Sequence, residues 1–381
     1  MATRYFWLPL VLAAPVALAG PTDSKPGRFV AAVVDTQFTH WDKNRDGRLS
    51  REEIDAAVGN PAVAGDEAAA AAALHVYFRN NPKADPLTPA FVAEAAKKSL
   101  PAERRDQAQK AQHFQSDYDR FRNHIRTAPH DLFTGTAPQL KGMSQGALGD
   151  CYFVSVVGAA VHAHRQRVLQ MFRPAKDGAC ELDFPDGTKV LVRKLTDAQI
   201  ALGSTAGEQG RWLNVLEEGF GQVRFARQAK KQPGDIPLDV ISRGGDPATA
   251  IALLTGHKAE CVDVLKHAND HAATARLRAT MIASSKGRLL MDCGTPETGT
   301  PPGVPGGHCY AVLGFDAATD TVHLWNPWGN TFHPKKEPYG LMNGYPVKDG
   351  RFDVPLGDFV KIFGYFDWET HEPLNPAPKK R

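Results

Sequence analysis

Residues 143–155 read MSQGALGDCYFVS, and this stretch determines the fold expected for the larger part of the chain. Gly149 and Asp150 form a turn that can cap a helix, and the apolar run after Cys151 predicts a buried helix beginning at the cysteine. The unpaired N–H groups and the dipole of a helix N-terminus lower the pKa of a thiol, as a nucleophile requires. Gln145 lies where its amide and the Cys151 N–H can meet at one carbonyl oxygen. The alternative is an inert buried cysteine.

Two later segments supply the other groups that a cysteine nucleophile needs. GGHCYAVLGFD at 306–316 places His308 between a Gly-Gly turn and a predicted strand, and HLWNPWGN at 323–330 places Asn326 at the end of a second strand. An imidazole held by a strand can act as the base, and an amide can orient it. The chain order is Cys, His, Asn, with separations of 157 and 18 residues. The three segments therefore predict a catalytic triad.

These motifs resemble those of the calpain family of papain-like cysteine proteases. GALGDCYF resembles the family's nucleophile segment QGxLGDCWF, GGHCYAVLGF its His motif, and WNPWGN its Asn-Pro-Trp-Gly motif. RWLNVLEEGFGQV at 211–223 and SRGGDPATAIALLTGH at 242–257 are similar to two further family segments. The resemblance runs in order from Phe133 to Tyr365.

The resemblance implies an α+β fold with a two-lobed papain-like cysteine protease core at 136–367. A helical lobe would carry Cys151, and an antiparallel β lobe would carry His308 and Asn326. The implied activity is hydrolysis of peptide bonds in protein or peptide substrates. Cys151 would be the nucleophile, His308 the base and then the acid, Asn326 the orienting amide, and Gln145 an oxyanion donor.

The resemblance also implies roles for residues beside the triad. Trp328 would shield the hydrogen bond between His308 and Asn326 from water, with ordinary core packing as the alternative. Gly306 and Gly307 would leave room for the substrate backbone.

Two other functions fit part of the pattern. A calcium-binding module could keep the protease-like core only as a binding scaffold, although a scaffold has no reason to retain Cys, His, Asn and Gln together. Transglutaminase chemistry uses a related Cys–His arrangement with Asp as the third group, and Asn326 disfavours it.

The N-terminal part carries a second motif, DKNRDGRLSREE at 42–53. Its spacing matches the EF-hand calcium loop, with Gly47 at the turn position that requires a residue without a Cβ. The expected Ca²⁺ ligands are Asp42, Asn44, Asp46, the Arg48 carbonyl, Ser50 and Glu53. The alternative is a polar turn that binds nothing.

A degenerate partner loop is expected at 80–91, because Leu87 lies 38 residues after Leu49, a plausible separation for paired EF-hands. This loop has Pro and Ala at ligand positions and Phe91 in place of the final Glu, so it cannot hold calcium. Residues 30–100 are therefore expected to form a small all-α EF-hand region. The polar stretch at 101–135 is expected to be a surface linker helix.

The calpain core itself binds calcium, and this chain departs from the family there. Gly142 and the Phe332–His333 pair stand where the family carries acidic residues. Glu217 remains as the plausible core ligand, so residues 136–367 alone are expected to bind no calcium tightly.

Composition and the chain ends limit the class of protein. The 381 residues are 42% apolar and 23% charged, as in globular proteins, and a formal charge of +3 argues against a nucleic-acid-binding protein with a large basic face. A short apolar run ending in Ala-Leu-Ala predicts a cleaved signal peptide at 1–19, with an uncleaved anchor as the alternative.

We therefore expect a secreted or periplasmic protein without stable membrane insertion. The Pro-rich basic stretch at 368–381 is expected to be a tail. Five cysteines allow up to two disulfides and leave at least one thiol unpaired, and the sequence indicates neither their pairing nor an oligomeric state.

Overall fold

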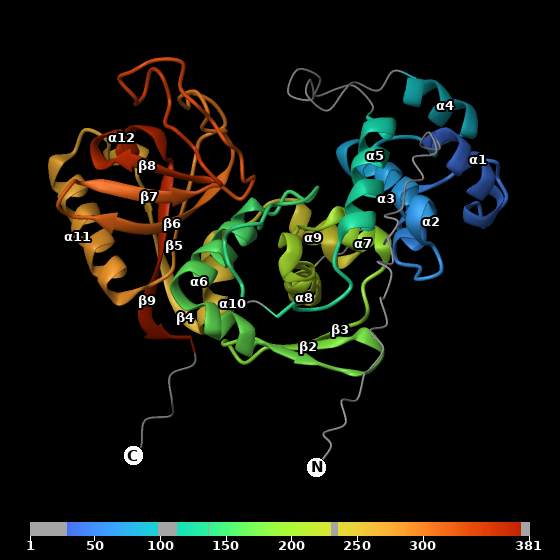
Figure 1. Ribbon diagram of the computed structural model, residues 1–381, viewed down its shortest axis with the longest axis horizontal. Coiled ribbons are helices and arrows are strands. Elements are labelled where there is room, and N and C mark those ends of the chain that lie inside the picture. The colour runs from blue at the N-terminus through green and yellow to red at the C-terminus, as the bar shows by residue number, and fades with distance from the viewer. Residues whose placement is uncertain (1–28, 98–112, 136, 230–234, 375–381) are drawn as a thin grey trace, which may run out of the picture.

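The protein folds as a mixed α+β structure with antiparallel sheets, as the sequence predicts. The computed structural model describes residues 29–97, 113–135, 137–229 and 235–374, so the expected signal peptide lies outside the described residues. Figure 1 shows a strand-rich lobe on one side and the N-terminal helices on the other. Within the described ranges, no helix has the length and apolar character needed to cross a membrane.

The N-terminal helices form two helix-loop-helix units. They are α1 (Val30–Trp41), α2 (Arg51–Val58), α3 (Gly65–Asn80) and α4 (Pro89–Lys97). Leu49 and Leu87 exchange two backbone hydrogen bonds, of 2.7 and 2.9 Å, between the two loops. The separation of these leucines along the chain predicts this apposition.

The central helix of this region is α3, whose alanines from Ala68 to Ala73 are all buried. Their small side chains let α2, α5 (Phe114–Thr127) and α7 (Asp197–Leu202) pack closely around it. The apolar core therefore continues from the N-terminal helices into the larger part of the chain.

The surface helix expected at 101–135 is present in the described part of that segment as α5, and one of its faces is packed against the protein. α5 buries Phe114, Tyr118 and Phe121, which recur on one helical face and pack toward α3 and α7. Polar residues cover only the outer face, so the overall composition of the segment hid an amphipathic helix.

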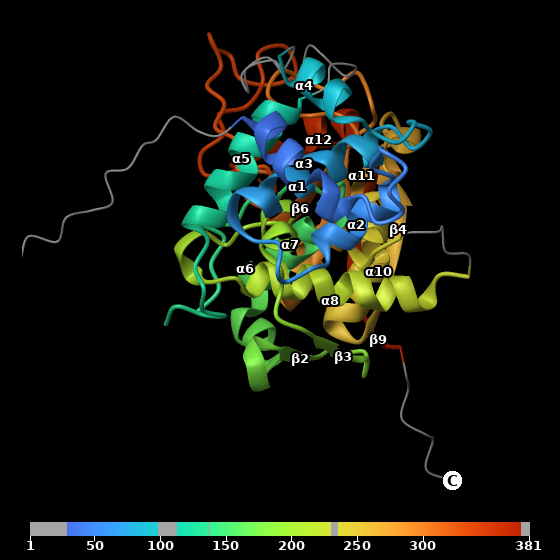
Figure 2. The same cartoon turned by 90° about the vertical axis from the view of Figure 1, so that its right-hand side faces the viewer.

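The helical lobe is built around α6 (Cys151–Gln170). Its other elements are α8 (Trp212–Arg227), α9 (Pro237–Ser242), α10 (Pro247–Thr255) and the sheet β1 (Phe172–Pro174), β2 (Cys180–Asp183) and β3 (Lys189–Val192). In Figure 2, β2 and β3 lie at the bottom edge, α4 at the top, and α8 between them.

The strand lobe is a six-stranded antiparallel sheet in the order β4-β9-β5-β6-β7-β8. The strands are β4 (His257–Asp263), β5 (Met291–Gly294), β6 (Cys309–Asp316), β7 (Thr321–Trp325), β8 (Arg351–Pro355) and β9 (Tyr365–Pro373). Helices α11 (His271–Gly287) and α12 (Leu356–Ile362) complete the lobe, which has its own apolar core.

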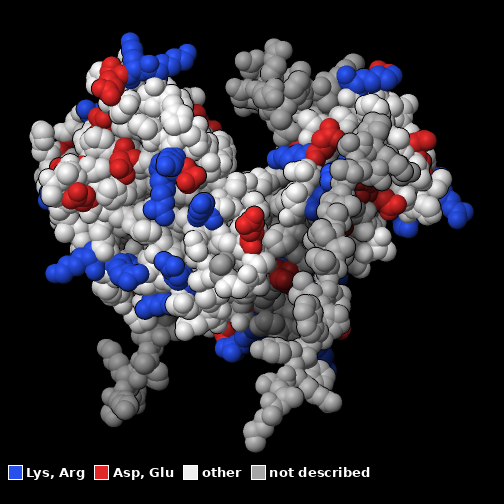
Figure 3. Space-filling view, viewed as in Figure 1, with Lys and Arg blue, Asp and Glu red and all other residues white. Residues whose placement is uncertain are grey.

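The two lobes meet where α6 packs against β5 and β6. Gly158 on α6 allows this close approach, because a Cβ there would lie 2.6 Å from the Trp325 ring. The space-filling view shows the molecule hollowed between the strand lobe and the N-terminal helices (Figure 3).

The predicted tail at 368–381 is wrong for its first part. Strand β9 continues to Pro373, which pairs with His257, and the Leu374 N–H donates to the Gly256 carbonyl at 2.9 Å. The exposed polar residues His371 and Glu372 near the end of this strand make the stretch look like a tail, although its backbone is paired and Glu369 is buried. Residues 375–381 lie outside the described residues.

Candidate active site

Cys151 is the first residue of α6, as the sequence predicts. Its backbone N–H has no acceptor within the helix, because the first turn of a helix leaves its donors unpaired. A hydrogen bond with the Cys309 thiol lowers the pKa of the half-buried Cys151 thiol most, and burial raises it. The hydrogen bond and charge of His308 lower it further, to about 4. The cysteine is therefore a thiolate near neutral pH.

His308 and Asn326 are brought together by the register of two neighbouring strands. His308 immediately precedes β6, Asn326 immediately follows β7, and these strands pair along their length. The buried His308 Nε2 lies 2.8 Å from Asn326 Oδ1. The backbone N–H of Trp328 also donates a hydrogen bond to Asn326 Oδ1, at 2.9 Å. Because that oxygen can only accept, Nε2 carries the proton and Nδ1 is the ring nitrogen left for the thiol.

Trp328 covers the imidazole from the solvent side. Its ring centroid lies 4.1 Å from that of His308 with an interplanar angle of 32°. The side chain is 49% exposed, so the alternative of ordinary core packing is wrong. The geometry instead fits the predicted shielding of the His308–Asn326 hydrogen bond.

Gln145 lies in the loop before Cys151, but its amide is already engaged. Its Nε2 donates to the Leu148 carbonyl at 2.7 Å and to Asp150 Oδ1 at 3.3 Å. Its backbone N–H donates to the Pro327 carbonyl at 2.8 Å, which ties this loop to the turn that carries Asn326. In this structure the Gln145 amide is therefore not free to donate to an oxyanion, the role predicted for it. Of its two hydrogen bonds, the longer one to Asp150 is the weaker and would break more easily.

A buried pair of acids lies behind Cys151, and sequence reasoning missed it. Asp150 is fully buried, and burial raises its pKa to about 6 although hydrogen bonds with Glu217 and Gln145 lower it. Burial and the neighbouring Asp150 raise the pKa of Glu217 well above its usual value. The Glu217 carboxyl accepts the Ser204 N–H and hydroxyl, both at 2.7 Å.

This pairing corrects two expectations. Glu217 is enclosed by protein groups, so it is not an accessible calcium ligand in the core. Asp150 occupies the N-cap position of α6, but its side chain makes no capping bond. In the sequence, the Gly-Asp-Cys segment indicated only a helix cap at Asp150. The pairing of Asp150 with Glu217 could not be predicted, because Glu217 is distant in sequence.

Gly306 and Gly307 are required by the turn that precedes His308. Gly307 has φ of +60°, and a Cβ there would lie 2.8 Å from the Glu297 carboxylate. A Cβ on Gly306 would collide with the Glu297 carbonyl. These contacts give both glycines a packing role, and the expected room for the substrate backbone stays a prediction.

The loop at 42–53 wraps its carboxylates inward. Asp42 accepts the N–H groups of Asp46 at 3.2 Å and Gly47 at 3.0 Å, and Gly47 adopts φ of +77°. Glu53 reaches back across the loop to accept the Lys43 N–H at 2.8 Å. These side chains therefore converge from both ends of the loop.

Glu53 also anchors the start of α2. It accepts the Ser50 N–H at 2.9 Å in a capping box. Partial burial raises the pKa of Glu53, but the backbone donors of Ser50, Lys43 and Asn44 outweigh it and hold the pKa below its usual value. Carboxylate, amide, hydroxyl and carbonyl oxygens are the donors that Ca²⁺ prefers, so the residues present fit this ion.

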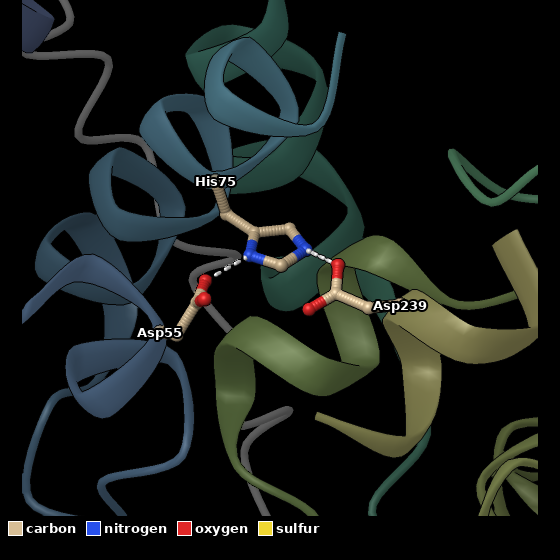
Figure 4. Close-up of side chains that lie close together, drawn as sticks. All are labelled: Asp55, His75 and Asp239. Carbon is tan, nitrogen blue, oxygen red and sulfur yellow. Dashed lines mark hydrogen bonds and ion pairs between the residues drawn. The ribbon is translucent and has the colours of Figure 1, made fainter. Parts of the chain in front are cut away.

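A buried cluster of Asp55, His75 and Asp239 was also missed by sequence reasoning (Figure 4). Across the described ranges, these three residues form the group of three or more His, Cys, Asp or Glu residues that each offer one ligand atom within 4.8 Å of the others. His75 Nδ1 lies 2.7 Å from Asp55, and Nε2 lies 3.3 Å from Asp239. Burial lowers the pKa of His75, but Asp239 and Asp55 raise it by more.

The cluster is an ion-pair bridge, because the two ring nitrogens point at different carboxylates and leave no common centre for a metal. It links α2 and α3 to α9 of the helical lobe. Arg51, the first residue of α2, adds a contact of 3.4 Å to Asp239. The loop at 42–53 is thus joined to the helical lobe through α2, the helix that follows it.

All five cysteines are free, so the structure contains neither of the disulfides that the composition allows. A comparison with models of known protein families yields no match, and a comparison with curated proteins yields none either. The functional conclusion therefore rests on the residues of the site.

Proposed function

We propose that this protein is a calpain-like cysteine endopeptidase that hydrolyses peptide bonds through Cys151, His308 and Asn326. The observation that carries the proposal is the 2.8 Å hydrogen bond between His308 and Asn326 at a thiol activated by the same imidazole. A nucleophile, a base that activates it and a third group that orients the base are what acyl transfer requires. The two-lobed arrangement around α6 is consistent with a papain-like core.

The proposed reaction has two steps, acylation of Cys151 and hydrolysis of the resulting thioester. The Cys151 thiolate attacks the carbonyl carbon of the scissile bond, and the His308 imidazolium gives its Nδ1 proton to the departing amine as the C–N bond breaks. The product is a thioester on Cys151. His308 then takes a proton from water, the resulting hydroxyl attacks the thioester, and the acid product leaves as the thiolate returns.

In both steps negative charge develops on the carbonyl oxygen of the substrate, and hydrogen-bond donors are needed to stabilise it. The unpaired backbone N–H of Cys151 supplies one donor at the helix N-terminus. Gln145 supplies the second if its amide exchanges the 3.3 Å bond to Asp150 for the oxyanion. Asn326 keeps the imidazole in the reactive tautomer, and Trp328 keeps water from competing for that bond.

We further propose that the loop at 42–53 binds Ca²⁺, which would neutralise the carboxylates gathered there. The proposed ligands are Asp42, Asn44, Asp46, the Arg48 carbonyl, Ser50 and Glu53. Export as a secreted or periplasmic protein stays a prediction.

Cleavage of casein by the full chain tests the proposal. Cys151→Ala is expected to abolish the activity, whereas Cys180→Ala, which removes a buried thiol on β2, is expected to retain it. Circular dichroism of both variants would verify that they fold. Wild-type protein that binds calcium but cleaves nothing would favour the alternative of a calcium-binding module on a silent scaffold.

A further inference from the structure

A pocket of 720 Å³ opens between the two lobes. Gly245, Asp246 and Pro247, at the start of α10, line it from the helical lobe. The strand lobe contributes β4, the turn at 295–296 and the start of β9. The pocket is therefore formed at the junction that a peptide substrate of the proposed protease would enter.

The pocket wall is continuous with the candidate active site. Tyr365, which lines the pocket, lies with its hydroxyl 2.9 Å from the Cys309 thiol, and that thiol contacts Cys151. Thr295 lines the same pocket, and its N–H donates to the His308 carbonyl at 2.9 Å. A side chain in this pocket would belong to a substrate residue close to the scissile bond.

The pocket carries an excess of negative charge. Its charged lining residues are Asp246, Asp263, Asp367 and Lys266. Lys266 is already paired with Asp263 at 2.5 Å. Asp246 and Asp367 are left without a cationic partner among the described residues that line the pocket.

Asp367 is the most informative of these residues. It is 1% exposed, and neither of its carboxylate oxygens has a hydrogen-bond partner of ordinary geometry. In the sheet it lies directly between Cys261 on β4 and Asp292 on β5. Asp292 is also fully buried, and neither of its oxygens has a hydrogen-bond partner of ordinary geometry, although the Ser155 hydroxyl lies near enough to lower its pKa. Two adjacent buried carboxyls without a counter-charge are costly unless they are protonated or a cation approaches them.

We propose that this pocket receives a lysine or arginine side chain of the substrate, a specificity that rests on the proposed protease function. The apolar surfaces of Pro247, Leu265 and Tyr365 would pack along the aliphatic part of such a side chain. Its charged end would face Asp246 at the rim and the field of Asp367 in the wall. A neutral side chain would leave these carboxyls without a partner.

The preference is expected to depend on pH. Burial raises the pKa of Asp367 to about 7, the charge of Asp246 raises it further, and the Cys261 thiol opposes both. Burial also raises the pKa of Asp292, which faces Asp367 from β5. Asp367 gains its charge as the pH rises through about 7, so the preference for a cationic side chain increases from pH 6 to pH 8.

Peptide binding to the full chain with Cys151→Ala tests the specificity without cleavage. The probes are N-acetylated hexapeptide amides that carry either arginine or norleucine at each position in turn, titrated calorimetrically in EDTA. At one position arginine is expected to bind about tenfold more tightly at pH 8, as for one charge-assisted hydrogen bond. Equal affinities of the arginine and norleucine peptides at every position would overturn the proposal.

Variants on the same background identify the residues responsible. Asp367→Asn is expected to remove most of the arginine preference. Asp246→Asn, which keeps an N-cap residue on α10, is expected to reduce it even if the first variant does not fold. Glu260→Gln is the matched control, since Glu260 lies on β4 next to Cys261 but on the opposite face of the strand. A preference that survives both Asp variants would also overturn the proposal.

The specificity and the protease function can fail separately. If wild-type protein cleaves norleucine and arginine peptides equally and Cys151→Ala abolishes both, the protease function stands and the specificity is wrong. If arginine peptides bind preferentially through Asp246 and Asp367 but wild-type protein cleaves none of them, the pocket stands and the protease function is wrong.

Discussion

The reactivity of the cysteines gives the most quantitative prediction. The pKa of Cys151 is about 4, against a usual value of 9.0. Five pKa units correspond to about 7 kcal/mol of preference for the thiolate. By contrast, burial and the charge of Asp367 raise the pKa of the more exposed Cys261 to about 12. At pH 7 Cys261 is therefore almost entirely protonated, while Cys151 is almost fully ionised.

Iodoacetamide is accordingly expected to label Cys151 before the exposed Cys261. The rate constant for Cys151 should stay nearly constant from pH 5.5 to pH 8, whereas an ordinary thiol reacts about tenfold faster per pH unit in this range. Peptide-level mass spectrometry after short exposures measures both rates. Faster labelling of Cys261, or a rate for Cys151 that rises tenfold per pH unit, would refute the reasoning.

Cys309 provides the perturbation that tests the cause. Its hydrogen bond to Cys151 and its burial raise its own pKa, so it keeps its proton and donates. Cys309→Ala removes one hydrogen bond to a charged acceptor, which is expected to raise the pKa of Cys151 by roughly 1–2 units. Cys309→Ser keeps a donor at the same place and is the matched control. Identical profiles for both variants would exclude the hydrogen bond as the cause.

Three further predictions follow from the same structure. Any calcium isotherm of the full chain should disappear in Glu53→Gln and persist in the neighbouring Glu52→Gln; a tight isotherm that survives Glu53→Gln would locate the ion elsewhere. Burial raises the pKa of Glu218 from 4.5 to about 7. The buried acid therefore destabilises the fold as the pH rises through that range. Glu218→Gln should raise the free energy of unfolding in urea by up to about 3 kcal/mol at pH 8 and by little at pH 4, whereas an equal effect at both pH values would exclude ionisation as the cause. His308→Ala should reduce kcat/KM for a peptide substrate by about 10²–10⁴-fold, and Asn326→Ala by less, because Asn326 orients the base and transfers no proton; the reverse order would contradict the assigned roles.

Local patterns in the sequence predicted the features that depend on neighbouring residues. The start of α6 at Cys151 follows from the glycine-containing turn and the apolar run after it. The approach of His308 to Asn326 follows from two strands that pair in register. The inward carboxylates of the loop at 42–53 follow from its spacing, and the Leu49–Leu87 bridge from the distance between the two loops.

The features that were missed depend on residues far apart in the chain. Asp150 meets Glu217, and His75 meets Asp239, only because α8 and α9 pack beside the N-terminal half of the molecule. Each residue alone reads as an ordinary surface group, and no local period marks its burial. The acidic wall around Asp367 is of the same kind, since it requires the alignment of three strands.

The central claim is that Cys151 forms a covalent bond to the substrate during peptide hydrolysis. Wild-type protein mixed with excess peptide, quenched in acid within the first turnover and mapped by mass spectrometry, tests it most directly. The account predicts a thioester of the substrate's acyl part on Cys151, which forms and decays at rates compatible with turnover and accumulates on none of the other four cysteines. Turnover without an adduct on Cys151, or hydrolysis that continues at the wild-type rate in Cys151→Ala, would contradict it.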